Sequence, residues 1–157
     1  MLTHQWVLDN FEYRADGLYW QTTNQKRKTG HRAGSMDNRG YRSIGLRING
    51  KLLRYFEHRL CWFYMTGQWP QHMIDHVDRD KSNNAWSNLR EATRSQNAMN
   101  QNATGVYWNK DRLKWQAQIK VNGKPKNIGR FINYDEALKA RQEAEIKYFG
   151  EFAPIRG

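Results

Sequence analysis

The sequence predicts an α+β chain in two parts, each combining short antiparallel strands with helices. In the first part, short apolar strands joined by turn residues give way to the apolar period of a helix, and a strand, loop, strand and helix follow. The last part has the pattern of three strands and one helix. With 157 residues, 38% of them hydrophobic, the chain can bury the core of one domain or two small ones, but not that of a large enzyme.

The first fifty residues are expected to form short strands. Leu18–Trp20 is one of them, and alternate apolar residues within 44–48 would share one face of another. Asn49–Gly50 has the composition of a tight hairpin turn into a further strand. A helix should then run from about Tyr55 to Met65 and end at Gly67.

A strand–loop–strand–helix unit comes next. The first strand is expected at residues 73–77, and a polar loop at residues 78–87 leads to the returning strand. Thr93 and Gln96 have the spacing of a capping box, which begins a helix and places Asn97 in its first turn. The order is that of a ββα unit.

Residues 98–103 are polar and are interpreted as a linker to a second, smaller unit. The strands expected there are Val106–Trp108, Trp115–Val121 and Lys126–Phe131. Asn122–Gly123 would turn the second strand into the third. Asn133 and Glu136 are placed to cap a final helix that ends at Gly150. Small residues on one face of this helix would let it lie close against the sheet.

The charge points to a polyanionic partner. The formal net charge is +11, and a basic surface of this kind fits the phosphate backbone of a nucleic acid, although a merely soluble basic protein is the alternative. The basic loop at residues 25–32 is either a solvated turn or a phosphate contact. His58 and Arg59, on the polar side of the expected helix, either touch nucleic acid or serve the structure.

The cysteine content and hydropathy indicate a compartment. Cys61 is the only cysteine, so neither an intramolecular disulfide nor a cysteine-rich zinc site can form. No apolar run approaches the length of a membrane span, and the first residues lack the pattern of a signal peptide. We therefore expect a cytoplasmic protein with no membrane partner that is not secreted.

Asp75 and His76 raise the question of catalysis. Hydrolysis of a phosphodiester needs a base and a cation, and a neutral histidine with carboxylate and amide oxygens for a hard divalent ion can supply both. Neighbours on a strand point to opposite sides unless the strand ends there, so a bend is required for both to reach one cleft with Asn97. Asn88 could tie the polar loop to its own backbone. On spacing alone, a structural histidine in an Asx-rich loop is the favoured alternative.

The same loop partly matches a calcium-binding loop. Asp78, Asp80 and Ser82 resemble its first ligands. The sixth position, however, would be Asn83 in place of glycine and the twelfth Leu89 in place of glutamate, so we reject an EF-hand.

The larger pattern of residues 54–100 resembles the HNH family of homing-type endonucleases. The motifs that carry it are His58-Arg-Leu, Trp69-Pro, Ile74-Asp-His-Val-Asp, Asn83-Asn, Ser87-Asn-Leu-Arg and Thr93-Arg-Ser-Gln-Asn. The resemblance implies a ββα-metal (His-Me finger) nuclease core within a domain of residues 1–100. It further implies that His76 is the general base, that Asp75 and Asn97 bind one magnesium or manganese ion, and that Asn88 holds the loop. Asn97 stands where many members have histidine, which favours a single ion.

Residues 103–153 resemble the Apetala/ethylene-response-factor DNA-binding domain. The resemblance rests on Gly105-Val-Tyr-Trp108, Lys114-Trp-Gln-Ala-Gln-Ile-Lys120, Asn122-Gly-Lys124, Ile128-Gly-Arg-Phe131 and Asp135-Glu-Ala137. It implies a three-stranded antiparallel sheet in the major groove with one helix behind it. The implied contacts are Tyr107, Asn109, Arg112, Gln118, Lys120 and Arg130. Each of these alone fits a solvated strand residue equally well, and the family's sequence preference does not transfer.

Together these features predict a metal-dependent endonuclease acting on double-stranded DNA. A monomer with one metal should nick, whereas a homodimer or repeated nicking should cut both strands. A catalytically silent DNA-binding regulator and an RNA-binding protein are the alternatives, the latter because seven Trp and eight Tyr could stack on unpaired bases.

Overall fold

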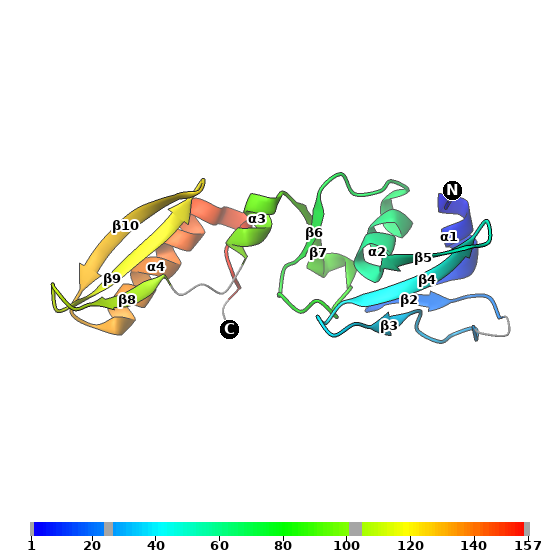
Figure 1. Ribbon diagram of the computed structural model, residues 1–157, viewed down its shortest axis with the longest axis horizontal. Helices are drawn as coiled ribbons and strands as arrows, with labels where there is room; N and C mark the ends of the chain where they lie inside the picture. Colours follow the sequence, from blue (N-terminus) through cyan, green and yellow to red (C-terminus); the bar gives the residue numbers. More distant parts are fainter. Residues whose placement is uncertain (1, 24–26, 101–104, 156–157) are drawn as a thin grey trace. The chain divides into compact units, whose positions relative to one another are not determined.

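The computed structural model describes residues 2–23, 27–100 and 105–155, which form two compact units (Figure 1). The first unit ends at Ala92 and the second begins at Thr93. This boundary precedes the linker expected at residues 98–103, because residues 94–99 are helical and group with the second unit. Residues 101–103 of that linker lie outside the described residues. No helix of the described ranges is long and apolar enough to cross a membrane.

The first unit combines two helices with three small sheets. Its elements are α1 (His4–Asn10), β1 (Phe11–Arg14), β2 (Gly17–Trp20), β3 (Ser35–Met36), β4 (Arg42–Ile48), β5 (Lys51–Phe56), α2 (Glu57–Thr66), β6 (Met73–His76), the 3₁₀ turn η1 (Trp86–Asn88) and β7 (Leu89–Ala92). Every strand pair is antiparallel, in the orders β1-β2, β3-β4-β5 and β6-β7. Helix α2 packs against β2, β4 and β5 and closes the core (Figure 1).

The core explains which expectations hold in this unit. Ile44 and Leu46 are fully buried on one face of β4, and the Asn49–Gly50 turn has the positive φ values, 49° and 78°, of a tight hairpin. Helix α1 was not expected, and the prediction of strands alone was wrong there. Thr3 caps α1 by accepting a hydrogen bond from the Trp6 amide, and only Val7 of its residues is buried.

Helix α2 begins two residues later than expected. Strand β5 extends to Phe56, whose backbone is extended, and Glu57 is the first helical residue. The helix ends at Gly67, whose φ of 73° is the left-handed conformation of a helix C-cap. Its end is therefore as predicted, and its start places Glu57 at the N-terminal turn.

The second unit is a three-stranded sheet with a helix against one face. Its elements are α3 (Arg94–Met99), β8 (Val106–Asn109), β9 (Lys114–Val121), β10 (Lys124–Phe131), α4 (Tyr134–Phe149) and the 3₁₀ turn η2 (Gly150–Phe152). The sheet is antiparallel in the order β10-β9-β8, and α4 lies across it (Figure 1). The three strands, the Asn122–Gly123 turn and the helix end at Gly150 are as predicted. Buried Ala137 and Ala144 lie on the α4 face that meets the sheet.

Of the two expected capping boxes, one is present. The Thr93 hydroxyl accepts from the Gln96 amide and the Gln96 side chain accepts from the Thr93 amide. At α4 the expectation was wrong in its chemistry. Asn133 is the N-cap, but its side-chain amide donates to the Glu136 carboxylate over 3.3 Å and accepts no hydrogen bond from the helix backbone.

Candidate nuclease site

His76 is the last residue of β6, where the chain leaves the sheet. It pairs with Leu89 of β7, and its carbonyl accepts from the Arg79 amide, so a turn follows at once. Arg79 itself has a φ of 69°. The strand thus ends at the required place, and both Asp75 and His76 are buried, at 5% and 4% exposure.

Asn88 clasps the loop that follows His76. Its side-chain oxygen accepts from the Asp78 amide at 3.0 Å, and its side-chain nitrogen donates to the Asp78 carboxylate at 2.8 Å and to the Asn83 carbonyl at 2.9 Å. One buried amide therefore joins both ends of the loop, and Asn83 adds a bond of 2.7 Å to Asp78. The sequence suggested that Asn88 ties the loop to its own backbone, and its hydrogen bonds with the Asp78 amide and the Asn83 carbonyl are of that kind.

His76 is held from a second side by Asn84. The His76 Nε2 atom lies 3.0 Å from the Asn84 side-chain oxygen, and the Asn84 side-chain nitrogen donates over 2.5 Å to the carboxylate of Glu57. Asn84 and Glu57 are fully buried. Neither was singled out from the sequence, although the Asn83-Asn pair was part of the family pattern.

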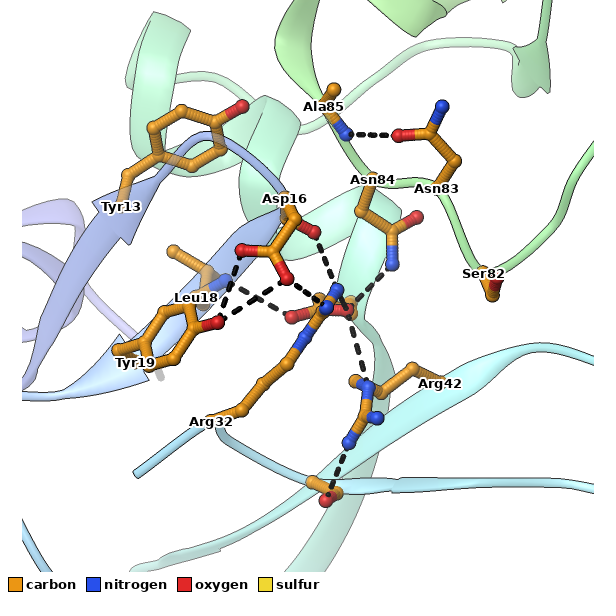
Figure 2. Close-up of polar contacts among 12 residues, drawn as sticks. Tyr13, Asp16, Leu18, Tyr19, Arg32, Arg42, Ser82, Asn83, Asn84 and Ala85 are labelled. Atoms are coloured by element: carbon orange, nitrogen blue, oxygen red, sulfur yellow. Dashed lines mark hydrogen bonds and ion pairs between the residues drawn. The ribbon is translucent and has the colours of Figure 1, made fainter. Parts of the chain in front are cut away.

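Glu57 is the centre of a buried ion cluster. Its carboxylate accepts from the Leu18 amide at 3.0 Å and from the Arg32 guanidinium at 3.1 Å, and Arg42 lies 3.7 Å away. Arg32 also pairs with Asp16. Arg32, Arg42 and Asn84, which come from separate segments (Figure 2), each make a hydrogen bond or ion pair with this carboxylate. The N-terminal strands are thereby tied to the loop beside His76.

Close approach of the backbone makes this cluster possible. Gly17 has a φ of 147°, and a Cβ atom there would lie 2.5 Å from the Glu57 Oε1 atom. A side chain would therefore push the carboxylate out of its place. Glycine at this position is required by the buried acid.

His58 is part of the same interior. Its ring stacks on Phe56 with centroids 5.4 Å apart and meets the His76 ring edge-on at 5.2 Å. Burial, with a smaller effect of His76, lowers the pKa of His58 to about 3, so this ring is neutral at physiological pH. His58 is only 7% exposed, and this burial favours a structural role over a DNA contact.

Arg59 has a structural environment as well. Its guanidinium donates to the carbonyls of His72 and Pro70, at 3.2 and 3.3 Å. It thereby braces the segment that leads into β6. The side chain is half-buried, so only part of it is exposed to a partner.

The two expected metal ligands lie in different units. Asp75 forms an ion pair with Arg90. The Nε and Nη2 atoms of the Arg90 guanidinium lie 2.9 and 2.8 Å from Asp75 Oδ2. Asn97 is in the first turn of α3, where its amide donates to the Thr93 carbonyl. Within the described ranges, no group of three or more His, Cys, Asp or Glu side chains is arranged to hold a metal. Asp75 and Asn97 offer a carboxylate and an amide oxygen, a donor set that fits magnesium in kind.

Five of the six expected contacts in the second unit share the face of the sheet turned away from α4. Tyr107 and Arg130 flank Gln116 in register across the three strands, with Asn109, Gln118 and Lys120 at alternate positions along the same face. The sixth, Arg112, lies in the turn between β8 and β9, where its amide donates to the Asn109 side chain. Trp115 packs on the opposite face with the core.

The centre of this outer face was missed from the sequence. The Gln116 side chain accepts from Asn109 at 3.1 Å and donates to Asn127 at 3.4 Å, so a row of amides crosses all three strands. Amide side chains can donate and accept at once, which suits the edges of bases. Strand alternation from Gln118 would have found Gln116.

Comparison with known proteins gives a match over the segment that holds the first of these sites. Residues 55–99 match the family model described as HNH endonuclease, and the matched segment contains Glu57, Asp75, His76, Asn88 and Asn97. This match supports a nuclease that hydrolyses phosphodiester bonds. The chain is also similar to the HNH homing endonuclease I-HmuI, from a structure described as DNA binding and cleavage by that enzyme. The identity is 29% and the TM-score 0.46. That likeness covers 59% of this chain and 51% of I-HmuI, so the chain spans about half of the solved protein. A comparison with curated proteins gives no match.

Proposed function

We propose that the chain is a metal-dependent DNA endonuclease of the homing HNH type. His76 acts as the general base, and Asp75 and Asn97 bind one magnesium or manganese ion. The observation that supports this most strongly is the family match over residues 55–99, which coincides with the buried His76 at the end of β6 and the loop that Asn88 clasps.

The proposed chemistry assigns one task to each residue. His76 takes a proton from the attacking water, because a neutral imidazole is a base near pH 7. Asn88 keeps the loop after His76 closed, so that the ring faces one direction. The ion, when bound, would stabilise the charge that develops on the phosphate and leaving oxygens. Arg90 holds one oxygen of Asp75 and so orients that carboxylate.

Duplex DNA is the proposed substrate. The net charge of +11 favours a polyanion and predicts binding that weakens steeply with salt. The outer face of β8, β9 and β10, with its row of amides and with Lys120 and Arg130, is the proposed second contact. Residues 103–153 would then serve as a DNA-binding domain of the Apetala/ethylene-response-factor type. This raises the effective concentration of the nuclease at the duplex.

A single site with one ion cuts one strand per encounter. We therefore propose that a monomer nicks DNA and that two copies, or repeated nicking, are needed for a double-strand break. A supercoiled plasmid reports the difference directly, because one nick gives open circles and a paired cut gives linear DNA.

The test compares the wild type with His76→Ala and with a control, His72→Ala, at low salt with magnesium or chelator. His72 has an exposed side chain and lies outside the site. Open circles that require both magnesium and His76 support the proposal. Binding without cleavage by the wild type would instead favour a DNA-binding regulator, and preference for single-stranded RNA over the duplex would favour an RNA-binding protein.

A further inference from the structure

The residues that hold the His76 ring form a buried chain of three side chains. His76 Nε2 lies 3.0 Å from the Asn84 oxygen, and the Asn84 nitrogen lies 2.5 Å from Glu57 Oε2. The three side chains come from β6, from the loop after it and from the first turn of α2. None is exposed by more than 4%.

Glu57 decides which way the Asn84 amide points. The carboxylate already accepts from the Leu18 amide and from Arg32, and a second guanidinium, Arg42, is nearby. A carboxylate paired with cations carries no proton and can only accept. The Asn84 atom that faces it must therefore be the NH₂ group. Its oxygen then faces His76.

The orientation of the amide in turn decides where the His76 proton lies. An amide oxygen cannot donate, so the 3.0 Å contact is a hydrogen bond only if Nε2 carries hydrogen. In a neutral imidazole the lone pair is then on Nδ1. The nitrogen that takes the proton from water is thus selected by a carboxylate two side chains away.

We propose that Asn84, anchored by Glu57, is a positioning residue that keeps the proton of neutral His76 on Nε2 and so makes Nδ1 the basic nitrogen. The catalytic consequence rests on the proposed nuclease function, but the tautomer itself does not. This role links the N-terminal part of the unit to the site, since Leu18 and Arg32 hydrogen-bond the carboxylate from 39 and 25 residues away.

The experiment is a long-range ¹H–¹⁵N spectrum of the full chain with labelled histidines, recorded without metal at a pH where His76 is neutral. The signals of His76 are assigned by their loss in His76→Ala. We expect Nε2 to carry the proton in the wild type, with a downfield, slowly exchanging Hε2 signal. Asn84→Leu, which keeps the volume and removes both bonds, should abolish that slow exchange. Asn83→Ala changes the neighbouring amide, which contacts Asp78 and not His76, and should keep it.

Two spectral results would overturn the proposal. One is a wild-type tautomer with the proton on Nδ1, which needs no variant and so remains decisive if Asn84→Leu does not fold. The other is an unchanged Hε2 signal in folded Asn84→Leu. A thermal melt of each variant shows that it is folded.

Activity then separates this proposal from the nuclease assignment. With duplex affinity unchanged, single-turnover cleavage by Asn84→Leu should fall at least tenfold. Wild-type-like cleavage by Asn84→Leu would contradict the positioning role. Absence of cleavage by the wild type would contradict the nuclease assignment and leave the tautomer result standing.

Discussion

Replacing Glu57 by glutamine tests the buried cluster most sharply, because the change keeps the shape and removes only the charge and one acceptor. The wild-type carboxylate accepts from the Leu18 amide, Asn84 and Arg32. Glutamine has one oxygen, so its NH₂ group must face at least one of these donors. Removing one partner of a buried ion pair costs about 3–5 kcal/mol, and the retained oxygen places Glu57→Gln near the lower end, at about 3 kcal/mol. For a unit of this size the melting temperature should fall by roughly 12 °C or more.

Urea denaturation followed by tryptophan fluorescence measures this loss. The control is Glu12→Gln, the same chemical change in the Arg14–Glu12 pair, whose side chains are 44% and 49% exposed. An exposed pair contributes little, so this variant should unfold with the wild type. The reasoning is refuted if Glu57→Gln is no less stable than Glu12→Gln.

Two further predictions concern His58 and the sheet of the second unit. Because burial lowers the pKa of His58 from 6.5 to about 3, the unfolded chain takes up this proton first as the pH falls. Burial of neutral His58 therefore leaves the free energy of unfolding at its full value above pH 6.5. Between pH 6.5 and pH 3 this free energy falls by about 1.4 kcal/mol per pH unit. Denaturation at several pH values should show a shallower decline for His58→Phe, and an NMR titration of His58 above pH 5 would contradict this account. In the sheet, Arg130→Ala should weaken duplex binding and reduce the salt slope by about 1, whereas Lys139→Ala, on exposed α4 surface, should not. Equal losses in both variants would show that net charge alone matters.

Local chemistry explains which elements could be predicted from the sequence. Both Asn-Gly turns and the Gly67 helix end depend on positive φ values that few other residues adopt, so the residue type is itself the signal. Helix α1 has no such signal beyond its Thr3 cap, because Val7 is its only buried residue and no apolar period marks it. An apolar helical period can be recognised in a sequence only where several positions of the helix are buried.

The site residues also differ in whether their roles can be recognised from nearby sequence. Asn88 acts on a loop ten residues long, and an amide at the end of an Asx-rich segment suggests that role. Glu57 acts through partners 25, 27 and 39 residues away, and an acid at a helix start is normally a solvated residue. Its burial becomes visible only when Arg32, Asn84 and Leu18 meet in space.

The most direct measurement is the single-turnover cleavage rate of His76→Ala on a short duplex, with the affinity for that duplex measured on the same preparation. General base catalysis contributes roughly 10²–10⁴-fold, so cleavage should fall by at least about 100-fold while the dissociation constant stays within about twofold. Cleavage at the wild-type rate by a folded His76→Ala variant would contradict the assignment of His76 as the base.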